Sequence, residues 1–513
     1  MLKDVDRYFT QSSMPFERAS GILLHPTSLP SSFGIGDLGR SAYEFVDFLA
    51  QSGQKLWQIL PLGPTGYEHS PYIMNFSTFA GNPLMISLER LAEEGLLDAG
   101  TLVPLSGDKL EGDRVNFDLV IPYKTQFLQR AFEQFQSAPT PEFETFCTEQ
   151  AWWLDDYTLF MALLDANPGT TWTQWEPSVA RREPAALEAK RKELKNSVFF
   201  HQFLQFKFFE QWSQLRGYAN EKGIQIIGDV SIYVCHNSSD VWANPEFFKL
   251  DPETLESAYI AGVPPDYFSA TGQLWGNPVY DWDKLEEAEF SWWVDRVKAT
   301  LLYVDLVRVD HFRGFEAYWQ VPGGEETAMN GEWIEAPGVK FFETLAKKLG
   351  TLPVLAEDLG IITPKVEALR DGFEFPGMRI LMFAFGGDPN STYLPHNYVS
   401  NCLVYTGTHD NDTTLGWWNR ATAEEKQHCA RYLGYASPDE IKEINWELIR
   451  LALSSVANQA ILPLQDLLGL DNRGRMNDPS TNAGNWRWRY ESSELLTEQL
   501  RDRLLELTQL YGR

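Results

Sequence analysis

Three apolar stretches in the second half of the chain each end in acidic residues. YVDLVRVD ends at Asp310, LPVLAED ends at Glu357 and Asp358, and CLVYTGTHD ends at Asp410. The strands of a parallel barrel bring the side chains at their C-terminal ends to one common mouth. Carboxyl groups held at a fixed separation are what the cleavage of a glycosidic bond requires, because one attacks and another supplies the proton. The three stretches therefore indicate a carbohydrate-cleaving site.

The first motif, RVDHFRG, places an arginine and an aspartate two residues apart. Alternate residues of a strand share a face, so Arg308 and Asp310 point the same way. A guanidinium group beside Asp310 keeps this carboxylate ionised and oriented, as a nucleophile at an anomeric carbon must be. Taken alone, the pair is equally typical of a buried ion pair that only fastens a barrel.

The second motif, LAEDLG, places two acids side by side in sequence. Neighbouring residues of a strand face opposite sides, so only one of them points into the mouth unless the strand has bent. A carboxyl group that stays protonated can donate to the departing glycosidic oxygen, and we assign Glu357 this task. Either acid could instead cap the following helix, and for Asp358 we favour that structural role.

The third motif, GTHDNDT, follows an apolar strand and continues into a loop. A carboxylate at Asp410 can hold sugar hydroxyl groups and stabilise a cationic transition state, and the His409 imidazole can bond to the same sugar ring. A turn rich in Asn and Asp caps would explain the composition as well. Each motif is ambiguous alone, and the three together point to one site.

These motifs require a scaffold of parallel strands. Eight apolar runs bounded by turn residues and separated by helix-compatible stretches predict an all-parallel sheet closed into a (β/α)8 TIM barrel. The acids follow the fourth, fifth and seventh runs. The runs are GILLH from Gly21, KLWQILPL from Lys55, IQIIGDV from Ile224, YVDLVRVD from Tyr303, LPVLAED from Leu352, MRILMFAF from Met378, CLVYTGTHD from Cys402 and AILPLQD from Ala460.

The spacing of the runs predicts where the barrel is decorated. About 165 residues separate the second run from the third, far more than a strand–helix unit needs. We expect one catalytic domain over 1–513, with a mainly helical inserted subdomain over 84–200. A second inserted subdomain over 231–300 is expected to carry a loop that covers the active site. Leu204, Phe208, Trp212 and Leu215 are spaced as the buried stripe of a helix.

Composition limits the partners. With 43 basic and 71 acidic residues the formal charge is −28, which disfavours nucleic acid and anionic membranes and suits a neutral substrate. The four cysteines have no paired spacing, so neither a zinc site nor a disulfide framework is predicted. The N-terminal residues contain no apolar signal core. We expect a soluble cytoplasmic protein, or one of the plastid stroma if the sequence is a processed form.

The motifs RVDHFRGF, LAEDLG and GTHDN resemble the catalytic segments of the amylomaltases, also called disproportionating enzymes or 4-alpha-glucanotransferases, in the alpha-amylase superfamily. The resemblance extends from about Gly21 to Arg489. It implies that Asp310 is the nucleophile, Glu357 the acid/base and Asp410 the transition-state stabiliser. Further matching segments are GILLHPTSLPSSFGIGDLG, QILPLGPTGYEHSPY, GDVSIYVCHNSSDVWANP, AGVPPDYFSATGQLWGNPVYDW and NAGNWRWR.

The same resemblance implies further site residues, no cofactor and no metal. Malto-oligosaccharides and alpha-1,4-glucans are the expected substrates, and the oligomeric state is not predicted. Ser231 stands where the family is expected to carry proline, which concerns the stiffness of the loop rather than catalysis. The residues expected to support the acids or contact sugar are Arg308, His409, Asp229, His311, Tyr72 and Asn277.

The resemblance implies a retaining mechanism with a covalent glucosyl-enzyme intermediate, from which a 1,4-alpha-glucan segment passes to the 4-hydroxyl group of an acceptor glucan. Transfer rather than hydrolysis then requires that a sugar reach this intermediate before water does. The segment PPDYFSATGQLWGNP has the glycines and aromatic rings of a covering loop, and Tyr267, Phe268 and Trp275 are candidates to stack on sugar rings. Trp242 and Tyr72 are further candidate contacts. For each ring singly, ordinary packing is an equal alternative.

Three rival functions share parts of this pattern. A hydrolase of the alpha-amylase type would use the same three acids and would differ only in its products. A metal-dependent barrel enzyme would use His311, Glu357, His409 and Asp410 as ligands, although the His–Asp pairs are adjacent rather than at helical spacing. A non-catalytic glucan-binding protein would bind substrate and turn nothing over.

Overall fold

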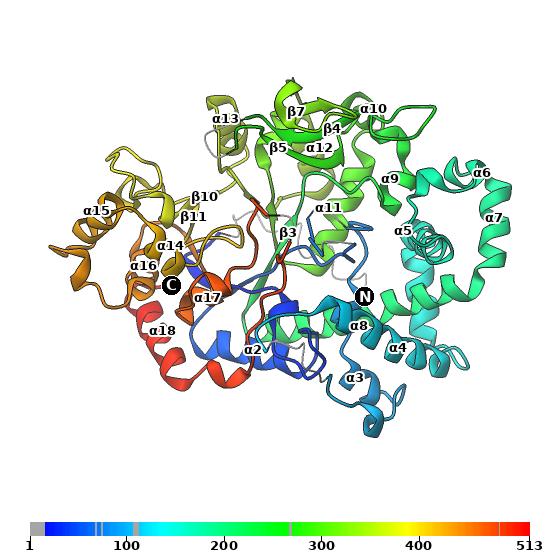
Figure 1. The fold of residues 1–513 in the computed structure, drawn as a ribbon, viewed down its shortest axis with the longest axis horizontal. Coiled ribbons are helices and arrows are strands. Elements are labelled where there is room, and N and C mark those ends of the chain that lie inside the picture. Colours follow the sequence, from blue (N-terminus) through cyan, green and yellow to red (C-terminus); the bar gives the residue numbers. More distant parts are fainter. Residues whose placement is uncertain (1–15, 67–68, 73–74, 106–111, 266–268, 482) are drawn as a thin grey trace.

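Eight parallel strands form a closed barrel at the centre of the computed structural model (Figure 1). The structure describes residues 16–66, 69–72, 75–105, 112–265, 269–481 and 483–513. Going round the barrel, the order is β1-β12-β11-β10-β9-β6-β3-β2, so the barrel strands follow one another in the order in which they occur along the chain. The predicted (β/α)8 barrel is therefore confirmed.

The barrel strands are short and nearly all their residues are buried. Their bounds are β1 Ala19–Leu23, β2 Leu56–Gln58, β3 Gln225–Val230, β6 Leu306–Val309, β9 Val354–Ala356, β10 Gly377–Ile380, β11 Cys402–Tyr405 and β12 Gln459–Pro463. Each predicted acid comes after its strand has ended, at residues 310, 357 and 410. The acids thus belong to the loops at the mouth, whereas the strands form the buried wall of the barrel.

A helical insertion joins β2 to β3. Its two longest helices, α5 and α8, pack against each other along their length. Leu204, Phe208, Trp212 and Leu215 of α8 are at most 4% exposed, so the predicted buried stripe is confirmed. The insertion contains α3 Leu88–Glu93, α4 Phe117–Phe135, α5 Pro141–Ala166, α6 Pro177–Ala180, α7 Pro184–Glu193 and α8 Lys195–Glu221.

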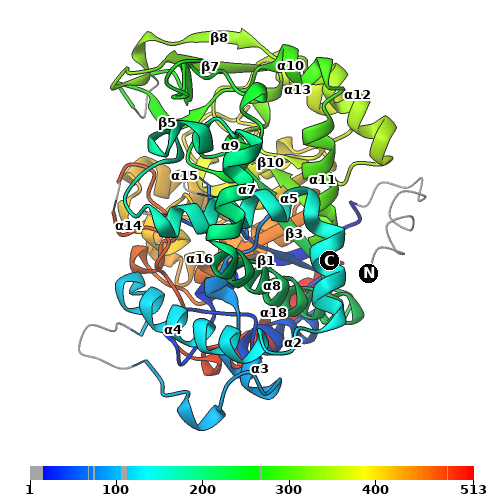
Figure 2. The ribbon, with the colours of Figure 1, turned by 90° about the vertical axis from the view of Figure 1, so that its right-hand side faces the viewer.

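A four-stranded antiparallel sheet, in the order β5-β4-β7-β8, is the second insertion. β4 (Tyr259–Val263) and β5 (Gln273–Pro278) precede barrel strand β6, but β7 (Ala317–Pro322) and β8 (Glu332–Glu335) follow it. This sheet is therefore built from two connections of the barrel, the one from β3 to β6 and the one from β6 to β9. The sequence analysis did not predict this pairing. In both ribbon views it lies at the top, opposite α3 and α4 (Figures 1 and 2). The division into subdomains 84–200 and 231–300 stays a prediction.

The remaining helices surround the barrel. α2 follows β1, α11 precedes β6, α12 precedes β9 and α13 precedes β10, as a strand–helix repeat requires. The group α14 to α16 fills the connection between β11 and β12. The bounds are α2 Arg40–Gln51, α9 Ser239–Ala243, α10 Trp282–Glu287, α11 Ser291–Tyr303, α12 Gly338–Leu349, α13 Pro364–Gly372, α14 Thr414–Arg420, α15 Ala423–Leu433, α16 Ile444–Ser454, α17 Leu464–Leu467 and α18 Glu498–Leu510.

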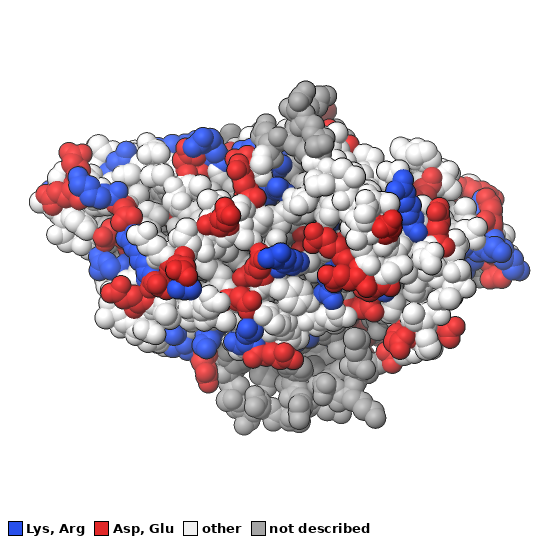
Figure 3. Space-filling model, turned by 90° about the horizontal axis from the view of Figure 1, so that it is seen from below, with Lys and Arg blue, Asp and Glu red and all other residues white. Residues whose placement is uncertain are grey.

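The surface carries charges of both signs. On the face seen in Figure 3, acidic and basic side chains are intermixed over the described residues. Within the described part of the chain, no helix has the length and apolar character needed to span a membrane.

Candidate active site

Arg308 lies between two carboxylates at the mouth of the barrel. Its Nη1 is 2.7 Å from Asp229 Oδ2, and its Nη2 is 2.9 Å from Asp310 Oδ1. Strand register explains the first contact, because Asp229 on β3 pairs directly with Arg308 on β6. The second follows from the shared face of residues two apart. The Arg308 side chain is 4% exposed and that of Asp310 is 31% exposed, so Asp310 alone of the pair faces the open mouth.

Electrostatics in this cluster depend on burial. Burial raises the pKa of Asp229 to about 7, although Arg308 acts in the opposite direction. Burial alone would lower the pKa of Arg308, but Asp229 and Asp310 raise it well above its ordinary value. Arg308 therefore remains a fixed positive charge beside Asp310.

Tyr72 connects this cluster to the third motif. Its hydroxyl group donates to Asp229 Oδ2 at 3.0 Å, and its ring stacks on His409 with the centroids 5.0 Å apart. Tyr72 and Asp229 also form part of the wall of a pocket that continues toward Asn75 and Tyr233. The Tyr72 ring is therefore placed by a hydrogen bond at one end and a stacking partner on its face.

Glu357 is held by two backbone N–H groups. His311 N donates to Oε2 at 2.7 Å, and Leu359 N donates to Oε1 at 2.8 Å. His311 has a φ of 51°, in the left-handed region that non-glycine residues rarely adopt. That unusual backbone is part of the turn in which the His311 amide meets the carboxyl group. Burial, and next the charge of Asp310, raise the pKa of Glu357 to about 8.

Asp358 has a structural role that differs from the expected one. Its Oδ1 accepts from Met378 N at 2.6 Å, and its Oδ2 binds Arg370 and also Arg379 at 3.3 Å. The following helix is capped by Thr363 instead. The predicted helix cap is therefore wrong: Asp358 ties the segment after β9 to β10 and to α13.

Asp410 is bound by Asn477, a residue that the sequence analysis did not single out. Asn477 Nδ2 donates to Asp410 Oδ1 at 2.6 Å, and His409 Nε2 is 3.4 Å from the same oxygen. Burial lowers the pKa of His409, although Asp410 acts in the opposite direction, so the ring is a neutral partner. Trp486, in the matching segment NAGNWRWR, lies 5.6 Å from the Tyr72 ring and 5.9 Å from the His409 ring. In the sequence, the segment NAGNWRWR was the one indication that this part of the chain contributes to the site.

The remaining predicted contacts have different environments. The Trp275 ring lies edge-on to His311 with the centroids 4.8 Å apart, beside the Glu357 turn. Burial lowers the pKa of His311 to about 3, so its ring is neutral too. Asn277 is buried on β5. Tyr267 and Phe268 lie outside the described residues.

Trp242 corrects an expectation. It is fully buried, packed against Phe160 and Trp175, and its Nε1 donates to Val179 O at 3.2 Å. It forms part of the core between α5 and α9, away from the mouth, and cannot stack on sugar there.

The structure therefore brings together two classes of group at one mouth. Asp310 and Asp410 are part-exposed carboxyl groups with charged or amide partners, and Glu357 is a half-buried carboxyl group whose raised pKa favours its protonated form. Among the described residues, no cluster of three or more His, Cys, Asp or Glu side chains is arranged to bind a metal ion. The fold and these groups define a barrel enzyme with acid–base chemistry at the C-terminal ends of its strands.

Comparison with known proteins identifies the family. The sequence model of the family described as 4-alpha-glucanotransferase matches residues 24–496, and the chain belongs to this family of glycosyltransferases that act on alpha-1,4-glucans. It is 56% identical over 503 residues to the 4-alpha-glucanotransferase of Synechocystis sp., covering 97% of this chain and 98% of the relative. It is 49% identical to that of Thermus thermophilus, covering 94% and 97%.

A solved structure agrees with the sequence comparison. The amylomaltase of Streptococcus agalactiae, in complex with acarbose, has a TM-score of 0.93 and 40% identity, covering 97% of this chain and 100% of that one. The predicted family and enzyme class are confirmed.

Proposed function

We propose that the chain transfers a 1,4-alpha-glucan segment from a donor chain to the 4-hydroxyl group of an acceptor glucan or glucose, by a retaining double displacement. The observation that carries this proposal is the contrast between Asp310, held by Arg308, and Glu357, whose pKa is raised to about 8. β6 and β9 are neighbours, and Val309 pairs with Ala356, so the next residue of each strand is an acid at the same level. Retaining enzymes use two carboxyl groups about 5 to 5.5 Å apart.

In the first step, Asp310 attacks the anomeric carbon while Glu357 gives its proton to the departing glucan oxygen. The segment to be transferred becomes bound to Asp310 as a glycosyl ester, and the rest of the donor chain leaves with a free 4-hydroxyl group. Asp410, with His409 and Asn477, stabilises the positive charge that develops on the ring between these states.

In the second step, the acceptor hydroxyl group attacks the same carbon and gives its proton to Glu357. Ester formation removes the negative charge of Asp310, which is the second cause of the raised pKa of Glu357. The pKa of Glu357 therefore falls in the intermediate, so the group that acted as an acid can act as a base. Two inversions at one carbon leave the alpha configuration unchanged.

Acceptor preference over water is the finer part of the proposal. Trp275 beside His311 supplies a ring at the edge of the site, and the antiparallel sheet carries it. We propose that this sheet and the segment with Tyr267 and Phe268 bind the acceptor and exclude water. The complex of the Streptococcus agalactiae amylomaltase with acarbose supports a sugar-like ligand for this chain.

Incubation with maltotriose tests the proposal. Wild type is expected to release glucose and to build a ladder of longer oligomers, whereas Asp310→Asn and Glu357→Gln lose about 10²- to 10⁴-fold in rate. Glucose and maltose without any longer product would show a hydrolase and contradict transfer. Unimpaired variants would contradict the assignment of the acids.

A further inference from the structure

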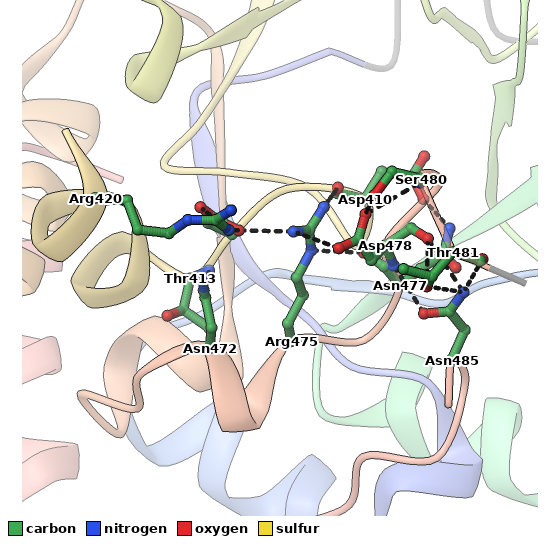
Figure 4. A network of polar contacts seen from close by, with 11 residues as sticks. Asp410, Thr413, Arg420, Asn472, Arg475, Asn477, Asp478, Ser480, Thr481 and Asn485 are labelled. Carbon is green, nitrogen blue, oxygen red and sulfur yellow. Dashed lines mark hydrogen bonds and ion pairs between the residues drawn. The ribbon is translucent and has the colours of Figure 1, made fainter. Parts of the chain in front are cut away.

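Arg475 is the centre of a polar network behind Asp410 (Figure 4). It comes from the loop after α17, 65 residues further along the chain. Its Nη2 donates to the Asp410 carbonyl oxygen at 2.7 Å, and its Nε donates to the Asn477 carbonyl oxygen at 2.8 Å. The Arg475 side chain is 17% exposed. One guanidinium group therefore binds the backbone of both Asp410 and the residue whose amide holds the Asp410 carboxylate.

Two further carboxylates orient this guanidinium group. Nη1 is 2.7 Å from Asp412 Oδ1 and 3.3 Å from Asp478 Oδ2. All three nitrogens are thus engaged in different directions, which suits the planar fork of arginine and not the single ammonium group of lysine. The positive charge of Arg475 also offsets the repulsion between Asp412 and Asp478, because it contacts both carboxylates.

We propose that Arg475 is a positioning residue for the transfer reaction, which fixes Asp410 and Asn477 relative to each other. This inference rests on the proposed role of Asp410. Arg475 reaches the peptide oxygens and not the Asp410 carboxylate itself, and Asn477 N further ties the loop by donating to His409 O at 3.0 Å. The two loops are not strands of the barrel, so loss of the guanidinium group leaves the spacing of Asp410 and Asn477 to the remaining hydrogen bonds between the loops, such as that of Asn477 N.

The expected signature is a fall in kcat with KM preserved. Displacing a catalytic group by about 1 Å can cost about 10²-fold in rate. We expect Arg475→Lys to lower kcat about 10²-fold and to change KM for maltotriose by less than about threefold, because the ground-state sugar depends less on Asp410 than the cationic transition state does.

Arg420 provides a matched control. It binds the same Asp412 carboxylate, at 3.1 and 3.2 Å, but its side chain is 67% exposed. Arg420→Lys is expected to keep kcat within about twofold of wild type, because exposed ion pairs contribute little. Equal losses in Arg475→Lys and Arg420→Lys, or a kcat of Arg475→Lys within about threefold of wild type, would overturn the inference.

A double-mutant cycle separates positioning from general destabilisation. If Arg475 acts through Asn477, Arg475→Lys combined with Asn477→Ala loses no more than the worse single variant. Multiplied losses would overturn the inference. Should Arg475→Lys fail to fold, Asp412→Asn decides: kcat reduced about tenfold supports the inference, and unchanged kcat overturns it.

Asp410→Asn distinguishes this inference from the proposal beneath it. An inactive Asp410→Asn together with a fully active Arg475→Lys contradicts only the positioning role. A fully active Asp410→Asn contradicts the proposed role of Asp410 itself, and the positioning role fails with it.

Discussion

The surroundings of Glu357 disfavour its ionised form. Replacing it by glutamine should therefore show how much this ionisation lowers the free energy of unfolding. Burial and Asp310 raise its pKa from the ordinary 4.5 to about 8. The folded protein therefore holds this proton more tightly than the unfolded chain does. Between these two pH values the folded state keeps a proton that the unfolded state has released, so the free energy of unfolding falls as the pH rises.

The size of the effect follows from the interval. At about 1.4 kcal/mol for each pH unit, the interval from 4.5 to about 8 gives an upper limit of about 5 kcal/mol. Glutamine does not titrate, so Glu357→Gln lacks this slope. Its amide must also turn one NH2 group toward the N–H of His311 or Leu359, which costs about 1–3 kcal/mol at every pH.

Denaturant unfolding of both proteins from pH 4.5 to 9 measures the difference. Wild type is expected to be the more stable at pH 4.5, and its advantage should shrink by up to about 5 kcal/mol and reverse toward pH 8. Every other titrating group is common to both proteins, so the difference isolates Glu357. A difference that stays constant with pH, or grows in favour of wild type, would refute the reasoning about the raised pKa.

Two further predictions concern the same cluster. The kcat/KM of wild type should fall about tenfold per pH unit above about pH 8, because a Glu357 that has lost its proton cannot protonate the leaving glucan; a flat profile to pH 10 would contradict its role as acid. Arg308→Met should lower the free energy of unfolding by about 3–5 kcal/mol, since it leaves Asp229 buried without its charged partner, and a loss no larger than that of Arg420→Met would contradict this.

The sequence was sufficient where chemistry and periodicity coincide. Apolar runs that end in acids predicted the barrel, because strand side chains obey local rules and the mouth follows from them. Asp358 shows the limit of the local rules: a strand-end acid next to Glu357 looked like a helix cap, but its partners are Arg370 and Arg379, and Arg379 follows a whole strand–helix unit later.

Contacts between loops distant in the sequence could not be predicted from it. Asn477 and Arg475 reach Asp410 from a loop without apolar periodicity, and only the fold brings these loops together. The antiparallel sheet was not predicted for the same reason: β4 pairs with β7, and barrel strand β6 lies between them in the sequence. The prediction for Trp242 was wrong because the sequence of a loop-like segment does not distinguish a tryptophan that contacts a ligand from one that packs in a core.

Trapping the glycosyl-enzyme tests the central claim most directly. The fluoride ion of alpha-maltotriosyl fluoride leaves without protonation, so Glu357→Gln should still form the glycosyl-enzyme. Because this variant has no base to activate an acceptor or water, the glycosyl-enzyme should break down slowly. Mass spectrometry of the intact protein and of its peptides is expected to find one maltotriosyl group on the peptide that contains Asp310. No adduct in a folded variant that binds the fluoride, or an adduct on Asp410, would contradict the account.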